Sequence, residues 1–210
     1  INPDDVLNTA RREALVLLIN RLCDLADQYA ASARVGAHRL PFRSRWAVPS
    51  AAGIYGEIAR RVKQSDGRSL DQRVVTSGTR KAGWVVKALA QSIERAYAKL
   101  EVKPDVLVAS YHGVPQRYLM EGDPYHCQCQ KTSRLLRERL GWDDTQLVTT
   151  FQSKFGPEEW LQPYTDKTIE ALAKEGVKNI AVFNPGFVAD CLETLEEIAG
   201  EGEEIFHEHG

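Results

Sequence analysis

The stretch "DVLVASYHGVP", residues 105–115, decides how the second half of this chain folds. Its first seven residues form a mostly apolar run bounded by Pro104 and Gly113, which is typical of a buried β-strand. His112 follows the run, and the Gly and Pro after it favour a loop. A titratable imidazole therefore stands at the carboxyl end of a predicted strand, where open α/β sheets bind ligands.

Downstream of this stretch, short apolar runs alternate with helical patterns. We predict strands over 105–111, 146–152 and 179–185, and helices over about 126–140, 163–175 and 189–199. Strands that alternate with helices indicate βαβ units, and hence a parallel sheet with right-handed crossovers. The predicted fold class is therefore α/β, with a partial doubly wound, Rossmann-like parallel sheet preceded by an all-helical segment.

Upstream, the pattern is helical throughout. A first helix is expected to be capped by Asp4 or Asp5 and to end before Pro41, with a buried face made of Leu15, Leu18, Ile19, Leu22, Leu25, Ala26 and Tyr29. Two more helices are expected over 46–63 and about 79–100, with Pro49 in the first turn of the earlier one. Their apolar stripes consist of Ala47, Ala51, Ile54, Ile58 and Val62, and of Val85, Leu89, Ile93, Ala96 and Leu100. We place the domain boundary between the helical residues 1–87 and the α/β residues 88–210.

Bulk properties exclude several classes of protein. A hydrophobic content of 43% and a net charge of −2 are typical of a globular domain without the positive field that nucleic acid requires. No run approaches the roughly 18 apolar residues of a membrane span, and the opening "INPDDVLNTARRE" carries charge where a secretory signal would be apolar. The four cysteines have no disulfide-framework spacing, so we expect a cytoplasmic protein with thiols or a metal site rather than disulfides.

Three stretches fall at the predicted carboxyl ends of the strands: "SYHGVP" (110–115), "FQSKFGPEEWLQPY" (151–164) and "NPGFVADCLETLEEI" (184–198). From the residues alone, His112 either ties a loop to the sheet or handles a proton or a metal. Glu193, Glu197 and Glu201 are spaced i, i+4 and i+8, so they share one helix face. That face is either solvated or suited to capturing a hard divalent cation.

Extended slightly, these motifs resemble ferrochelatase in order and spacing over about residues 88–210, in "SYHGVPQRYLMEGDPYHCQCQKTSRLL", "TTFQSKFGPEEWLQPYT" and "NPGFVADCLETLEEI". The resemblance implies a chelatase-type parallel sheet. It also implies an enzyme that inserts ferrous iron, one of its substrates, into protoporphyrin IX in haem biosynthesis. It implies that His112 and Glu193 are catalytic, that both also contact metal, and that Glu197 and Glu201 continue a metal-conducting line. The helix that carries these glutamates often contains a π-turn in this family. Tyr111, Phe155 and Trp160 are the expected porphyrin contacts, although Phe155 and Trp160 serve equally well as core or loop anchors.

The resemblance also implies what lies around the site. The family binds porphyrin in a cleft between two Rossmann-like domains, and we find neither the N-terminal domain nor the final strand and helix here. We expect no tightly bound cofactor and no [2Fe–2S] cluster, because the family's cluster cysteine spacing is not evident. "HCQC" (126–129) offers too few ligands for a metal site by itself. Peripheral membrane contact is compatible with the sequence, which does not predict an oligomeric state.

The first half resembles the C-terminal helices of phytoene synthases, of the squalene/phytoene synthase family. "YAASA…LP" (29–41), "AAGIYGEIARRV" (51–62) and "RVVTSGTRK" (73–81) carry this likeness, and the two halves join near "VVKALAQSIERAYAKL". The aspartate-rich, magnesium-binding motifs of that family are absent. The alternatives to a chelatase are therefore a non-catalytic chimera of two enzyme fragments or a remnant of a prenyltransferase.

Overall fold

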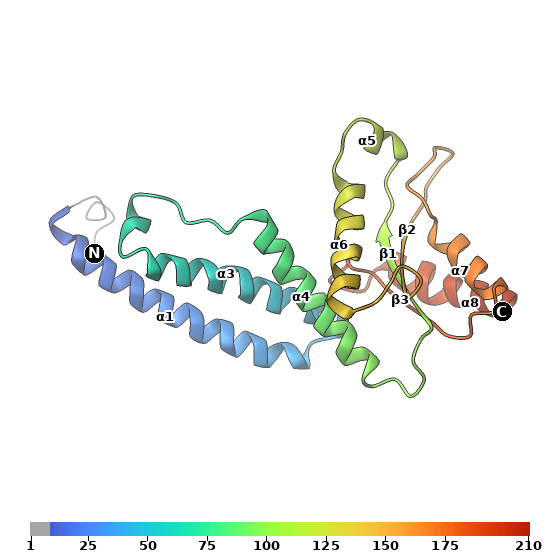
Figure 1. Cartoon of the computed structure of the whole chain (residues 1–210), viewed down its shortest axis with the longest axis horizontal. Coiled ribbons are helices and arrows are strands. Elements are labelled where there is room, and N and C mark those ends of the chain that lie inside the picture. Colours follow the sequence, from blue (N-terminus) through green and yellow to red (C-terminus); the bar gives the residue numbers. More distant parts are fainter. Residues whose placement is uncertain (1–8) are drawn as a thin grey trace. The chain divides into compact units, whose positions relative to one another are not determined.

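The computed structural model describes residues 9–210, so the expected caps Asp4 and Asp5 lie outside the described residues. The chain divides into two compact units, of which the first ends at Ala88 and the second runs from Leu89 to Gly210. Helix α4 (Gly78–Tyr97) contains the boundary (Figure 1). We describe each unit by itself.

The first unit is helical, as predicted. Its two long helices, α1 (Arg12–Gly36) and α3 (Ala47–Gln64), pack side by side (Figure 1). Pro49 is the third residue of α3 and lies in its first turn, as expected. The remaining pieces are short: η2 (Thr9–Arg11), η3 (Ala37–Arg39), α2 (Phe42–Arg45), η4 (Arg68–Leu70) and the first part of α4.

The buried faces of α1 and α3 differ from the prediction. Leu15 is buried, but four residues expected on the same buried face are exposed, namely Leu18, Leu22, Leu25 and Tyr29. In α3 the buried face contains small residues, among them Ala52, Gly53, Gly56 and Ala59. A Cβ on Gly53 would lie 2.4 Å from the ring of Trp84, so the close approach of that ring requires the small face. Helical periodicity identified the apolar stripe of each helix. It did not show which face of the helix is covered by the neighbouring helices.

The second unit is built on a parallel sheet of three strands, which confirms the predicted fold class. The strands β1 (Val106–His112), β2 (Leu147–Gln152) and β3 (Ile180–Phe183) lie in the order β2-β1-β3. In register, His112 lies opposite Gln152 and Ala109 lies opposite Phe183. The carboxyl ends of all three strands therefore meet at one edge of the sheet.

Helices cover both faces of this sheet (Figure 1). Alternate side chains of a strand point to opposite faces. On one face the Tyr111 hydroxyl lies 3.1 Å from Ser133 of α6 (Tyr125–Leu140). On the other face the Ser110 hydroxyl lies 2.8 Å from Thr165 of α7 (Thr165–Lys174). The sheet is therefore doubly wound, with a short helix α5 (Gln116–Met120) in the loop after β1.

The last helix starts later and runs further than predicted. It begins as a π-helix, η5 (Glu193–Glu201), and continues as α8 (Gly202–His209), whereas the sequence indicated 189–199. The Thr194 hydroxyl accepts a hydrogen bond from the Cys191 backbone N–H at 3.0 Å, which fixes where the helix begins. Single π-turns inside helices are frequent at functional sites.

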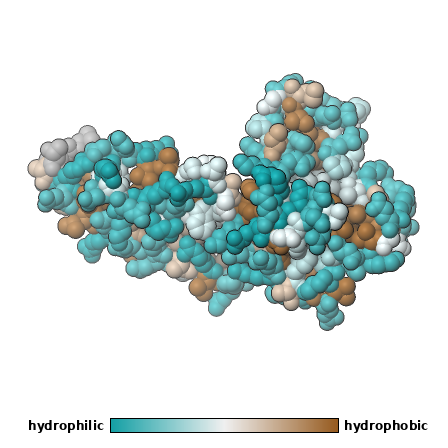
Figure 2. Space-filling model, viewed as in Figure 1, coloured by the Kyte–Doolittle hydropathy of each residue, from teal (hydrophilic) through white to brown (hydrophobic). Residues whose placement is uncertain are grey.

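Hydrophobic side chains gather in several separate patches on the face of the molecule shown in Figure 2. Among the large hydrophobic residues of the second unit, Met120, Phe155, Leu192 and Leu195 are largely exposed. Within residues 9–210, none of the helices combines the length and the apolar character needed to cross a lipid bilayer.

Candidate active site

His112 ends β1 with a half-buried side chain whose ring orientation is fixed locally. Its Nδ1 lies 2.6 Å from the carbonyl oxygen of Gly113. A carbonyl oxygen only accepts hydrogen bonds, so Nδ1 must carry the proton. In the neutral imidazole, the lone pair is then on Nε2, which is the nitrogen available to a proton or a cation.

The residue after the histidine must be glycine. The Gly113 N–H donates to the Gln152 carbonyl at 2.7 Å, and a Cβ at position 113 would lie 2.8 Å from that oxygen. This close contact draws the loop after β2 toward His112. The ring of Trp160 consequently lies 6.4 Å from the imidazole, centroid to centroid, and Phe187 lies 6.2 Å from it.

The "GDPY" turn (122–125) orders the backbone of the histidine. Asp123 accepts a hydrogen bond from the Tyr125 N–H at 2.8 Å. Tyr125, the first residue of α6, donates its hydroxyl to the His112 carbonyl at 2.8 Å. Half-burial raises the pKa of Tyr125 well above its ordinary value, so the phenol remains a hydrogen-bond donor.

Glu193 shares the site with His112. The pKa of Glu193 is lowered, first by a hydrogen bond from its own backbone N–H, then by Cys191, and also by Coulombic attraction to His112. One residue ends β1 and the other follows β3, and these strands are neighbours in the sheet. His112 and Glu193 therefore follow neighbouring strands at the carboxyl edge of the sheet.

Gln152 connects the three strand ends to Glu193. Its side chain is 3% exposed, and its Oε1 accepts hydrogen bonds from the Ser110 hydroxyl at 2.6 Å and from the Asn184 amide. Its Nε2 donates to the Glu193 carbonyl at 3.0 Å. All partners agree on one orientation of the amide, because a flip would place donor against donor. Sequence reasoning missed Gln152 and Asn184, although both lie in the quoted motifs, at positions that alternation directs to the face of His112.

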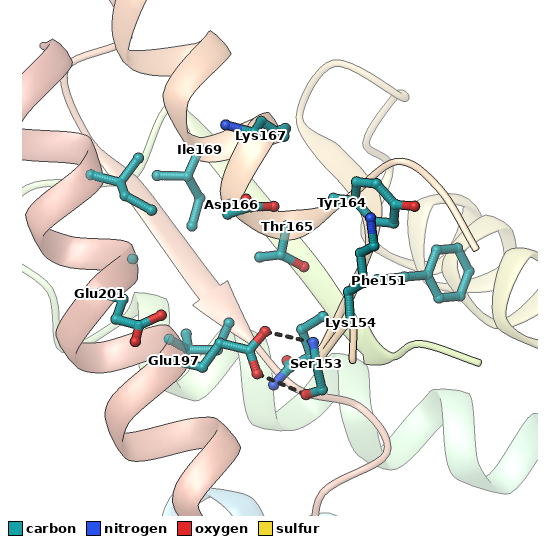
Figure 3. Close-up of a pocket in the computed structure, with 14 residues that line it drawn as sticks. Phe151, Ser153, Lys154, Tyr164, Thr165, Asp166, Lys167, Ile169, Glu197 and Glu201 are labelled. Carbon is teal, nitrogen blue, oxygen red and sulfur yellow. Dashed lines mark hydrogen bonds between the residues drawn. The ribbon is translucent and has the colours of Figure 1, made fainter. Parts of the chain in front are cut away.

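The two further glutamates line a pocket of about 360 Å³ between the end of β2, α7 and the last helix (Figure 3). The Glu197 carboxylate accepts hydrogen bonds from the Ser153 N–H at 2.5 Å and from its hydroxyl at 2.7 Å. Glu201 lies further along the same helix and is exposed. Across residues 9–210, no three His, Cys, Asp or Glu side chains lie close enough to hold one metal ion. His112, Glu193, Glu197 and Glu201 therefore do not form a single coordination sphere.

The residues expected to contact porphyrin have different environments. Phe155 is 83% exposed, and Trp160 is half-buried, with an Nε1 that has no hydrogen-bond partner among the described residues. Tyr111 corrects the expectation: it is 5% exposed, and its hydroxyl contacts Ser133 in the core, because the alternation of β1 turns it to the face opposite His112.

The "HCQC" stretch starts helix α6 and does not gather its sulfur atoms. Cys129 is buried, which raises the pKa of its thiol to about 11, whereas Cys127 is exposed. The ring of His126 stacks on Phe151 at 5.6 Å. All four cysteines of the chain are free thiols.

The parallel α/β sheet places an imidazole, a carboxylate and aromatic rings near its carboxyl edge, where proteins of this fold class bind their ligands. The family model described as Ferrochelatase matches residues 37–210. The chain is 68% identical over 125 residues to the ferrochelatase of Allorhizobium ampelinum, and 66% identical over 125 residues to those of Rhizobium etli and Rhodobacter capsulatus. The chain therefore belongs to the ferrochelatase family.

These alignments cover only part of each protein. They include 60% of this chain and 36% of the length of each of these three relatives, so the chain spans about a third of the curated proteins it matches. The family model starts at residue 37, inside the first unit. The comparisons do not show the resemblance of residues 1–87 to phytoene synthases.

Proposed function

We propose that this chain carries the catalytic half of a site that inserts ferrous iron into protoporphyrin IX in haem biosynthesis. The observation that supports this most directly is the placement of His112 at the end of β1 and of Glu193 after β3, the neighbouring strand of the sheet. Because the chain spans about a third of its relatives, the proposal includes a second wall of the cleft from sequence outside this chain.

The pair suits the proton transfers of metal insertion. A divalent iron that enters a porphyrin displaces two protons from pyrrole nitrogens, and these protons need acceptors. The Nε2 of His112 is free to take one, since Nδ1–H is held by Gly113. The lowered pKa of Glu193 favours the ionised carboxylate, which can attract the incoming cation. As a weak base at neutral pH it would hold the second proton only transiently and pass it on to water.

The aromatic residues and the remaining glutamates complete the proposed site. Trp160 flanks the imidazole and Phe155 is exposed in the same loop, so both are available to contact a flat macrocycle. Glu201 and Glu197 extend the negative charge of Glu193 along the last helix toward the surface, where they would draw in a cation. The exposure of Leu192 and Leu195 beside Glu193 supports a cover supplied by ligand or by another part of a longer protein.

The setting of the protein is part of the same proposal. Free thiols support a reducing, cytoplasmic location. Protoporphyrin and ferrous iron are the proposed partners, with peripheral membrane contact, no nucleic acid and no resident cofactor. We keep the phytoene-synthase likeness of residues 1–87 as a proposal for the origin of the helical unit.

A non-catalytic chimera is the second candidate, and the exposed leucines of α1 favour it. The two candidates differ in porphyrin binding, measured by absorbance titration of the whole chain with protoporphyrin IX, with and without a supplied N-terminal domain of a related ferrochelatase. A chelatase site predicts a spectral shift, weakened about tenfold by His112→Ala and by Glu193→Gln. Glu196→Ala is the matched control, because Glu196 is exposed on the same helix. No shift in either mixture favours the chimera.

A further inference from the structure

The turn that follows β2 holds an unusual backbone conformation. Ser153 has a φ of +64°, in the left-handed region that residues other than glycine rarely adopt. Both of its hydrogen-bond donors, the N–H and the hydroxyl, are directed to the carboxylate of Glu197 (Figure 3). A residue stays in such a conformation where its surroundings determine it, and here those surroundings are one glutamate.

The same turn also contacts the beginning of the π-helix. Gln152 donates a hydrogen bond to the backbone carbonyl of Glu193, and the next residue, Ser153, donates to the side-chain carboxylate of Glu197. Two consecutive residues at the end of β2 thus hold both ends of one turn of η5. That turn begins at Glu193, the proposed partner of His112.

We propose that Glu197 is a positioning residue, whose carboxylate clamps η5 to the end of β2 so that Glu193 faces His112. This inference rests on the proposed role of the His112–Glu193 pair. Each oxygen of the Glu197 carboxylate accepts one charge-assisted hydrogen bond from Ser153, so this side chain is held in place by the turn after β2. Glu196, one residue away, is exposed and offers a carboxylate of the same helix without this clamp.

Two substitutions separate the hydrogen bonds of Glu197 from its charge. Glu197→Ala removes both, whereas Glu197→Gln keeps a side chain of the same shape that can accept from the Ser153 N–H and donate to its hydroxyl oxygen. Amide hydrogen exchange of η5 in the full chain reports the clamp. We expect exchange about tenfold faster in Glu197→Ala, wild-type exchange to within about twofold in Glu197→Gln, and no change in the control Glu196→Ala.

The site itself is read from the ring signals of His112 in NMR spectra during titration with Co²⁺, a paramagnetic divalent probe. Positioning predicts that Glu197→Ala weakens the effect of Co²⁺ on these signals about fivefold and that Glu197→Gln restores it. If Glu197→Gln loses the effect as fully as Glu197→Ala while η5 stays protected, Glu197 acts through its charge and the inference is wrong. Unchanged exchange in Glu197→Ala also overturns it.

If Glu197→Ala fails to fold, Ser153→Gly takes its place, because glycine suits the φ of +64° and lacks the hydroxyl donor. We then expect exchange of η5 about threefold faster, and unchanged exchange contradicts the clamp. The proposed function fails separately, when the wild-type chain shows neither Co²⁺ nor porphyrin binding although the exchange pattern holds.

Discussion

The two faces of the parallel sheet are built from the same strands and hold their helices by different means. Toward α6, the buried rings of Tyr111 and Phe151 lie 6.2 Å apart, centroid to centroid, and α6 contributes the fully buried Leu136. Toward α7 and η5, the side chains of Ser110, Thr150 and Gln152 form hydrogen bonds. Ser110 donates to Gln152, Thr150 accepts from Thr165 of α7, and Gln152 donates to the backbone carbonyl of Glu193. Apolar packing is non-directional, whereas hydrogen bonds fix distance and angle. The polar face therefore positions the site, and the apolar face supplies more of the stability.

The largest expected effect lies on the apolar face. Phe151→Ala removes a ring that is 1% exposed and should lower the free energy of unfolding of the second unit by about 4 kcal/mol, because it leaves a cavity. Urea unfolding followed by circular dichroism measures it. The matched control is Phe155→Ala, four residues on and 83% exposed, with an expected change below about 0.5 kcal/mol. Equal losses in both variants would contradict the assignment of the faces.

On the polar face, Gln152→Leu keeps the volume of the side chain but removes its donor and acceptor. The Glu193 carbonyl and the donors of Ser110 and Asn184 lose a partner, which should destabilise the unit by about 2 kcal/mol. Urea unfolding measures this as well, and amide exchange should show η5 loosening more than α6. Gln128→Leu, at an exposed position of α6, is the control. Uniform loosening of both helices would count against a directional role for Gln152.

A smaller effect is expected where a hydroxyl lies on the apolar face. Tyr111→Phe leaves Ser133 without its partner and should lower the free energy of unfolding by about 1 kcal/mol. The double variant Tyr111→Phe/Ser133→Ala should recover part of this loss, since no buried group is then unpaired. Porphyrin titration should not respond to Tyr111→Phe, and a weakened titration would restore Tyr111 as a ligand contact.

The smallest effect concerns the pair itself. His112→Ala should raise the pKa of Glu193 only part of the way to its ordinary value near 4.5, because the backbone N–H that contributes most remains. A lowered carboxylate pKa stabilises the fold above the unfolded-state pKa, and this contribution is lost as the pH falls through the folded-state value. The free energy of unfolding should therefore fall less steeply with decreasing pH in His112→Ala than in the wild type. Carboxyl ¹³C NMR of Glu193 measures the pKa shift. An unchanged pKa would show that His112 does not influence the Glu193 carboxylate.

Prediction from the sequence succeeded best where local pattern decides the structure. The strand that ends at His112 was identifiable because an apolar run is bounded by Pro104 and Gly113. The buried face of α1 was wrong, because exposure of Leu18 and Leu22 depends on which helices are present to cover them. Tyr111 was misassigned although period-two alternation places it opposite His112, a signal that the sequence already contained.

The sequence by itself determined the strands and their parallel α/β arrangement, because these follow from periodicity and short motifs, and the family resemblance singled out His112 and Glu193 at the strand ends. Tertiary structure alone decided that Gln152 holds the start of η5 and that Glu197 is engaged by Ser153. These contacts join residues 41 and 44 positions apart. Local propensity carries no information about such distances, since only the packed sheet brings the end of β2 against the last helix.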